Sequence, residues 1–147
     1  MWSRAHAVVV PGKPAEVFAY IADLPRHAEW SPTPLRVEPE GDGPVRAGSR
    51  FRGVGETRGD EVVSTVEVTE VDPPRRLVFV ATSPSTIFRH EFTVTPEREG
   101  SRVERRMTLL RAKPALRLIW PLVGNRVIWP GAVAAVERLR EVLARRG

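Results

Sequence analysis

The sequence predicts an α+β fold in which one antiparallel sheet lies between helical segments near the two ends of the chain. Two changes of hydrophobic period support this prediction. A short amphipathic pattern after Pro14 gives way near Leu35 to alternating apolar and polar residues, and a helical period returns after Lys113. Alternation is typical of half-buried strands, and a period near 3.6 is typical of amphipathic helices. The 147 residues are 41% hydrophobic, enough for one core, so we expect a single domain over residues 1–147.

A strand and two short helices are expected before residue 35. The run HAVVV predicts the first strand. Pro14 favours a helix start, because its missing N–H needs no partner in a first turn. Asp23 then ends this helix in a capping role, Pro25 opens a second short turn that continues to Trp30, and Pro32 prevents further extension. The first helix has an apolar side formed by Val17, Phe18 and Ile21.

The central region predicts a meander, which makes six or seven antiparallel strands in all. Turn-forming residues separate its alternating runs: Gly-Asp near residue 59, Asp-Pro-Pro at 72–74, Ser-Pro-Ser at 83–85 and Glu-Gly at 99–100. Such punctuation between short β-rich segments is typical of hairpins.

Hairpin arithmetic predicts which side chains share a face of the sheet. A loop at 97–100 places Val94 opposite Val103, Phe92 opposite Arg105, His90 opposite Met107 and Phe88 opposite Leu109. A loop at 82–85 pairs Phe79 with Phe88 and Leu77 with His90, and a loop at 72–75 pairs Val68 with Phe79 and Val66 with Ala81. The three loops put these residues on one face. For Phe51 the parity stays open, because the ETRGDE loop can be counted in two ways.

The C-terminal region predicts a long amphipathic helix from Ala132 to Arg145, after breaks near Pro121 and Pro130. Its apolar stripe, formed by Val136, Leu139 and Leu143 together with Ala132, is expected to face the sheet.

Charge and composition exclude several classes of function. The formal net charge is +5, but the 23 basic residues, of which only two are lysines, are scattered and often adjacent to Glu. An arginine bias of this kind is typical of GC-rich bacterial genomes, and no nucleic-acid motif is present, so no nucleic-acid partner is expected. The most apolar stretch contains two arginines and two prolines, which argues against a transmembrane segment. Absent cysteines fit a reducing compartment, and the N-terminus resembles a strand more than a signal peptide, so we expect a cytoplasmic protein.

The sequence offers few groups for catalysis. It has no glycine-rich phosphate loop, no cluster with metal-ligand spacing and no serine with a recognisable base partner, so we expect neither a metal nor a cofactor. His6, His27 and His90 lie on separate predicted elements, and we expect His27 at the surface, with the mouth of a groove as the alternative. His90 and Arg105 interrupt the apolar face as diagonal neighbours, and they are the weak catalytic candidates.

A series of motifs resembles the SRPBCC (START-like) superfamily, polyketide cyclase/dehydrase-like branch. These are Val-Phe-x-x-Ile-x-Asp-Leu-x-x-x-x-x-Trp-Ser-Pro, GSRFRG, VTEVDPPRRLVF, FTVTPEREGSRV and the closing VERLREVL. The resemblance implies a helix-grip fold, a curved sheet wrapped around the C-terminal helix with a cavity between them, and two short helices that plug one end with Trp30 as the wedge. The ligand-binding residues expected on this basis are Trp30, Phe51, Val66, Phe79, Phe88, His90, Phe92, Arg105, Met107, Trp120 and Trp129. Aromatic residues on apolar faces are more often plain core, which is the alternative for the three tryptophans.

Three functions remain open at this point. The first is binding of an apolar or aromatic small molecule, polyketide-like or lipid-like, by a monomer or homodimer. The second is an enzyme similar to polyketide aromatase/cyclases or dehydrases. The third is a membrane-surface or interaction protein that uses its basic exterior.

Arg105 cannot stay buried without a partner, and we expect Glu137 or Glu141, water, or a ligand oxygen to satisfy it.

Overall fold

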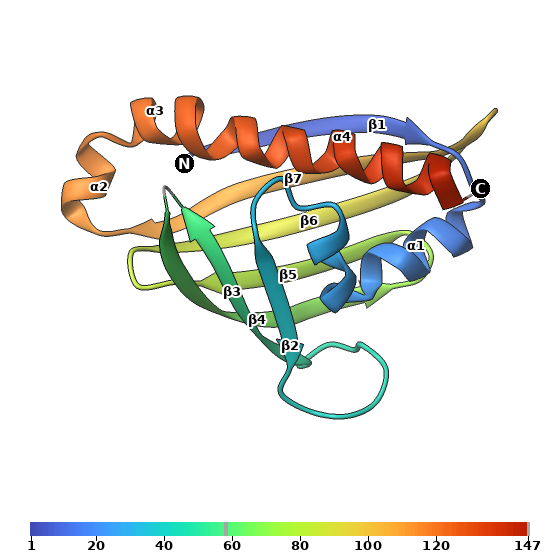
Figure 1. Ribbon diagram of the computed structural model, residues 1–147, viewed down its shortest axis with the longest axis horizontal. Helices are drawn as coiled ribbons and strands as arrows, with labels where there is room; N and C mark the ends of the chain where they lie inside the picture. The colour runs from blue at the N-terminus through green and yellow to red at the C-terminus, as the bar shows by residue number, and fades with distance from the viewer. Residues whose placement is uncertain (58, 147) are drawn as a thin grey trace.

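The computed structural model describes residues 1–57 and 59–146 and contains one curved antiparallel sheet with helices at its concave side (Figure 1). In these residues the sheet has seven strands in the order β1-β7-β6-β5-β4-β3-β2. The elements are β1 (Ser3–Val10), α1 (Pro14–Ala22), η1 (Leu24–Glu29), β2 (Leu35–Pro39), β3 (Arg50–Thr57), β4 (Asp60–Asp72), β5 (Arg76–Thr82), β6 (Thr86–Glu97), β7 (Gly100–Ala112), α2 (Pro114–Leu118), α3 (Trp120–Val123), η2 (Gly124–Ile128) and α4 (Trp129–Arg146). The predicted α+β helix-grip fold is confirmed.

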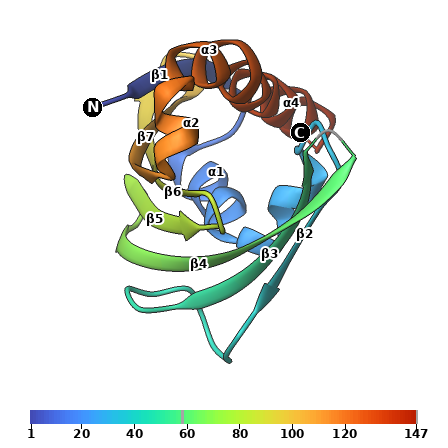
Figure 2. The same cartoon turned by 90° about the vertical axis from the view of Figure 1, so that its left-hand side faces the viewer.

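The C-terminal helix α4 lies across the opening of the curved sheet (Figure 2). Val136, Leu139 and Leu143 are buried in the main core, as the periodicity predicted. The helix begins three residues earlier than expected, at Trp129, and a π-helical turn leads into it. This turn precedes Pro130, which has no N–H to donate to the preceding turn, so the backbone widens there instead of breaking.

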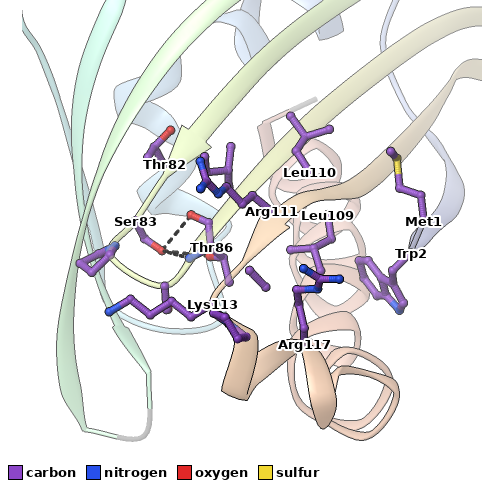
Figure 3. A pocket seen from close by; sticks show the side chains of 15 residues that line it. Met1, Trp2, Thr82, Ser83, Thr86, Leu109, Leu110, Arg111, Lys113 and Arg117 are labelled. Atoms are coloured by element: carbon purple, nitrogen blue, oxygen red, sulfur yellow. Dashed lines mark hydrogen bonds between the residues drawn. The ribbon is translucent and has the colours of Figure 1, made fainter.

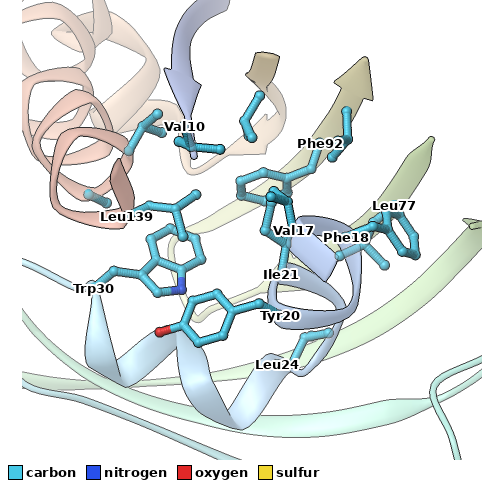
Figure 4. Packing of buried hydrophobic residues seen from close by; sticks show 14 of the residues in the cluster. Val10, Val17, Phe18, Tyr20, Ile21, Leu24, Trp30, Leu77, Phe92 and Leu139 are labelled. Carbon is cyan, nitrogen blue, oxygen red and sulfur yellow. The ribbon is translucent and has the colours of Figure 1, made fainter. Parts of the chain in front are cut away.

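Helices α1 and η1 follow β1, as predicted, and cover the other part of the concave face (Figure 1). Pro14 and Pro25 lie in the first turns of the two helices, and Asp23 caps the first. Trp30 follows η1 and is 2% exposed. Its ring points toward Phe92 and Leu139 in the core between sheet and α4 (Figure 4).

The strand register agrees with the prediction except in one hairpin. The β6–β7 pairs and both β4–β5 pairs are confirmed. Between β5 and β6 the register is displaced by two residues, because Ser83 and Thr86 close a tight turn around Pro84 and Ser85. A displacement of two keeps every side chain on its predicted face. The observed pairs are Leu77 with Phe92, Phe79 with His90 and Ala81 with Phe88.

The open parity of Phe51 is resolved by its pairing with Val66 on β4. Both side chains are buried in the main core. Arg58, in the middle of the ETRGDE loop, lies outside the described residues. The face predicted from β4 to β7 therefore continues onto β3.

Candidate ligand-binding site

A cavity of about 380 Å³ lies between the η1–β2 connection, β7 and the first half of α4, and we call it the groove cavity. Its volume is near the lower end of the range typical of small-molecule sites, roughly 300 to 1,000 Å³. The wall is formed by His27, Trp30, Ser31, Pro32, Thr33, Leu35, Glu56, Arg105, Met107, Val127, Ile128, Gly131, Ala132 and Ala135. It combines a largely apolar surface with a few polar groups.

The space exists because side chains on α4 are small at one end and large at the other. Gly131, Ala132 and Ala135 line the groove cavity in the first turns of the helix. Further along, larger side chains, Leu139 among them, fill the equivalent space and complete the main core. A gradient of side-chain size therefore divides the groove into a packed half and an open half.

His27 and Trp30 reach the groove cavity from η1. In a 3₁₀-helix, side chains three residues apart lie above one another, and the two ring centroids are 4.5 Å apart. The prediction that His27 is at the surface is wrong, because the residue is 8% exposed and its Nε2 donates a hydrogen bond to the Ile21 carbonyl at 2.7 Å. This assigns the proton to Nε2 and leaves Nδ1 as an acceptor. The buried backbone carbonyl offers the ring a partner that the sequence did not reveal.

Burial lowers the pKa of His27 to about 4, and the charge of Arg105 lowers it further, while the hydrogen bond to Ile21 opposes the shift. Burial also holds the pKa of His90 well below its ordinary value of 6.5, with smaller contributions from Arg105 and His27. Both imidazoles are therefore neutral near pH 7.

Arg105 brings a positive charge to the wall of the groove cavity. Its Nη2 donates to His90 Nδ1 at 3.2 Å, and its Nη1 donates to the Ala132 carbonyl at 3.4 Å. The guanidinium carbon lies 5.5 Å from the centroid of the Phe92 ring, within the range of a cation–π contact. The residue is partly exposed, yet its Nε is buried and has no hydrogen-bond partner in the described structure. Burial lowers the pKa of Arg105 to about 10, so it remains charged at pH 7.

The expected pairing of Arg105 with an acid from the terminal helix is wrong. No carboxylate of residues 1–57 or 59–146 forms a salt bridge with it. Glu137 instead contacts His6 Nε2 at 2.9 Å and also bonds Arg140, because this side of α4 packs against β1. Glu141 is exposed. Water or a ligand oxygen remains as the partner expected for the guanidinium.

The structure brings together only part of the predicted site. Trp30, Arg105 and Met107 line the groove cavity. His90 lies beside Arg105 and stacks on Phe79 with centroids 4.9 Å apart. Four further predicted residues belong to the main core: Phe51, Val66, Phe79 and Phe92. The remaining three, Phe88, Trp120 and Trp129, pack with Trp2 in a separate group that we call the tryptophan cluster.

Sequence reasoning placed His27 at the surface and gave the mouth of the groove only as the alternative, and it missed the small residues of α4 as site residues. The spacing of three between His27 and Trp30 in a proline-initiated turn was the available signal for a shared face. For α4, the signal was the succession of Gly131, Ala132 and Ala135 ahead of the larger residues on the same stripe.

Neither a metal centre nor a membrane-crossing helix is found among the described residues. Within the part of the chain that the structure describes, no three His, Asp or Glu side chains are placed to hold a metal ion. Over the same residues, every helix is too short or too polar to span a bilayer.

Solved structures with the same fold come from several bacteria. TTHA0849 from Thermus thermophilus superposes with a TM-score of 0.82 at 18% identity, covering 99% of both chains. Zhui aromatase/cyclase from Streptomyces sp. R1128 gives a TM-score of 0.77 at 16% identity, covering 99% of this chain and 94% of the other. Ms6760 from Mycobacterium smegmatis gives 0.72 at 21% identity, covering 96% and 90%. At these identities the likeness concerns the fold alone.

The sequence comparisons identify the family. A search of curated proteins finds no match to this chain. The family described as "Polyketide cyclase / dehydrase and lipid transport" matches residues 1–145, in agreement with the resemblance to the SRPBCC superfamily and with the helix-grip architecture. The chain therefore belongs to the polyketide cyclase / dehydrase and lipid transport family.

Proposed function

We propose that the protein binds an apolar or aromatic small molecule that carries an acidic or ketonic oxygen, and that this molecule occupies the groove cavity. The observation that carries the proposal is Arg105, a charged donor on a largely apolar wall with no carboxylate partner in the described structure. Its two acceptors, His90 Nδ1 and the Ala132 carbonyl, are neutral, and a charge on an apolar wall without a counter-charge is costly. A carboxylate, phenolate or enolate oxygen of a ligand would supply the missing acceptor.

Two unused donors support the same conclusion. Arg105 Nε and Trp30 Nε1 are both buried and have no hydrogen-bond partner in the described residues. Each unsatisfied buried donor costs about 1–3 kcal/mol. Both atoms are covered by neighbouring protein atoms, so a ligand oxygen would bond them only after the two side chains rotate toward the groove cavity; a pure hydrocarbon would satisfy neither.

The rest of the wall suits an apolar or aromatic body. Trp30, which follows η1, and Met107 of β7 both line the space, and Ile128 adds an aliphatic side chain from η2. Aromatic faces and the polarisable sulfur of methionine both contact aromatic rings favourably. A hydrophobic ligand of modest size fits this combination of volume and lining.

The test compares Arg105→Met with Arg106→Met, using 4-phenylbutyrate and butylbenzene as an acidic and a neutral probe. Arg106 is the adjacent residue of β7 and is exposed on the other face of the sheet, so Arg106→Met controls for the loss of one positive charge. By calorimetry, we expect Arg105→Met to weaken 4-phenylbutyrate by about tenfold or more, as for the loss of a charge-assisted hydrogen bond. Butylbenzene binding and the unfolding midpoint should change little.

Two results would contradict this assignment. If Arg105→Met unfolds the protein or weakens both probes equally, the residue is structural. If the wild-type protein binds neither probe at millimolar concentration, the groove cavity is not a site for this class of ligand.

A second candidate function, an enzyme of the aromatase/cyclase type, is favoured by one observation. His27 Nδ1, a free acceptor, and the Arg105 guanidinium belong to the same wall, and a base together with a cation can promote enolisation of a ketone. However, a pKa of about 4 makes His27 a weak base, whereas an effective general base has a pKa near the working pH. Binding is therefore the function that the geometry supports best.

A further inference from the structure

Helices α2 and α3 lie at the opposite end of α4 from the C-terminus (Figure 1). Several apolar side chains of these two helices and of their junction are exposed. Leu118, Ile119 and Leu122 are 85%, 49% and 53% exposed. Pro114 and Ala115, which precede these residues, and Pro121, which lies between Ile119 and Leu122, are exposed as well. Single exposed leucines are ordinary, but a contiguous apolar patch commonly marks an interaction surface.

The exposure of this patch is fixed by the packing beneath it. Trp120, in the middle of the segment, is 5% exposed, and its ring lies 5.6 Å from those of both Trp2 and Phe88. Asn125 accepts a hydrogen bond from Trp2 Nε1 at 3.1 Å and donates one to the Pro121 carbonyl at 2.7 Å. A buried tryptophan and a polar clamp thus anchor α2 and α3, while the leucines face outward.

Gly124 makes this anchoring possible. A Cβ at this position would lie 2.5 Å from Trp120 Nε1, which is well inside contact distance. Because glycine has no Cβ, the indole ring can pack directly against the backbone at the start of η2.

The patch belongs to a stretch of the chain whose charged residues are all basic. From Arg105 to Val136 the sequence contains no Asp or Glu. Within this stretch Arg111, Lys113, Arg117 and Arg126 are exposed, and none of them forms a salt bridge in the described part of the chain. The α2–α3 face, as we call it, consists of these four basic residues together with Pro114, Ala115, Leu118, Ile119, Pro121 and Leu122.

A cleft of about 700 Å³ adjoins this face, between the β5–β6 turn and α2. Arg111, Lys113 and Arg117 line it together with Trp2 and Leu109 (Figure 3). It offers basic side chains next to apolar ones and has room for a phosphate-bearing headgroup.

We infer that the α2–α3 face docks on an anionic phospholipid bilayer. Leu118, Ile119 and Leu122 enter the headgroup region, and the four basic residues contact lipid phosphates. One signal gives only marginal membrane binding, and stable attachment generally takes two, such as apolar insertion and a basic patch; this face provides both. The inference does not depend on the ligand of the groove cavity.

Charge favours a bilayer over a second copy of the chain. A two-fold symmetric contact through this face would place its basic residues opposite the same residues of the partner, and like charges across an interface are unfavourable. The face carries no acid of its own to offset them. Anionic lipid phosphates complement it directly.

The test is vesicle flotation with pure phosphatidylcholine and with phosphatidylcholine containing about 30% phosphatidylglycerol, at about 50 and about 500 mM NaCl. We expect the wild-type protein to float only with the anionic vesicles, and less so at high salt. Leu118→Gln with Leu122→Gln, and separately Arg117→Gln with Arg126→Gln, should each lower partitioning by about tenfold or more.

Matched controls use the same chemistry elsewhere on the surface. Val9→Thr with Val63→Thr removes exposed apolar surface from strands β1 and β4. Arg98→Gln with Arg138→Gln removes two exposed charges, one in the β6–β7 turn and one on α4. Both control pairs should leave partitioning unchanged.

Three outcomes would overturn the inference. The first is a wild-type protein that does not float with anionic vesicles at low salt. The second is an equal loss of partitioning in the control and test pairs. In the third, size-exclusion chromatography with light scattering shows that Leu118→Gln with Leu122→Gln converts a dimer to a monomer while flotation is unaffected, and the face then binds a second copy.

Discussion

At the scale of single residues, His27 links the site to the stability of the fold. Its ring is buried against Trp30, and its hydrogen bond to Ile21 uses the neutral form with the proton on Nε2. Burial lowers the pKa of His27 to about 4 from an ordinary value of 6.5. In the unfolded chain the same imidazole would titrate near the ordinary value, so the two states bind protons differently.

We predict that acid destabilises the protein through this group. Because the folded-state pKa is lowered, protonation favours the unfolded chain, so the stability is fully present above about pH 6.5 and is lost as the pH falls toward 4. For one imidazole with this shift, the free energy of unfolding should fall by roughly 1.5 kcal/mol between about pH 6.5 and about pH 5. His90, whose pKa is lowered in the same direction, adds to the loss.

Urea unfolding of the wild type and of His27→Gln at several pH values measures this effect. The glutamine amide can still donate to the Ile21 carbonyl but does not titrate, so the variant should lose less stability on acidification. Proton NMR of the imidazole gives the pKa directly. A His27 pKa near neutrality in the folded protein would contradict the prediction and would favour the enzyme over the binder.

Individual site residues were predictable where the sheet register fixes their position. His90 and Arg105 follow from the β6–β7 pairing alone, and the structure joins them by a hydrogen bond. His27 was not predictable in this way, because the face that a 3₁₀ turn presents depends on how it packs against other elements. The surroundings of Arg105 could not be predicted either, since Glu137 lies on the expected helix but turns toward His6.

At the scale of elements, α4 holds the curved sheet closed. Leu139 is fully buried at the centre of its apolar stripe. Leucine truncations in well-packed cores leave a cavity as well as losing buried apolar area.

We predict that Leu139→Ala lowers the free energy of unfolding by about 2–5 kcal/mol. Leu118→Ala is the matched control, because Leu118 has the same side chain in a helix but is 85% exposed. Chemical denaturation should show a change for Leu118→Ala within about 0.5 kcal/mol. A loss for Leu139→Ala as small as that of the control would remove α4 from the core.

Turn length was the weak point of the sheet prediction. The β4–β5 and β6–β7 hairpins have the expected register, and the error in β5–β6 is a shift of two residues. Ser83 and Thr86 close that turn with several hydrogen bonds that involve the Ser83 hydroxyl. Local polar contacts of this kind determine where the turn lies, and the hydrophobic pattern does not reveal them. The same pattern does reveal which side chains share a face of the sheet.

At the scale of the whole molecule, the groove cavity and the tryptophan cluster are neighbouring but different surroundings for the four tryptophans. Trp30 lines the groove cavity and the other three rings pack in the cluster, while Met107, Ile128 and Ala132 belong to both. The order of elements and their motifs predicted the fold and family. The position of the cavity could not be predicted, because it depends on the volume left unfilled by Gly131, Ala132 and Ala135.

This difference gives a prediction for tryptophan fluorescence. The chain has four tryptophans, of which Trp2, Trp120 and Trp129 belong to the tryptophan cluster and Trp30 alone lines the groove cavity. If 4-phenylbutyrate binds in the groove cavity, it changes the surroundings of Trp30 and leaves the other rings largely undisturbed. We therefore expect Trp30→Phe to remove most of the ligand-induced change in emission, and Trp2→Phe to retain it.

The same titration separates the groove cavity from the cleft beside α2, because Trp2 lines that cleft. A larger loss of the ligand-induced emission change in Trp2→Phe than in Trp30→Phe would place the ligand in the cleft beside α2. Equal losses in the two variants would mean that the ligand reports on neither site specifically. The two substitutions therefore distinguish whether the groove cavity or the cleft beside α2 receives the ligand, because each removes the one indole that lines that space.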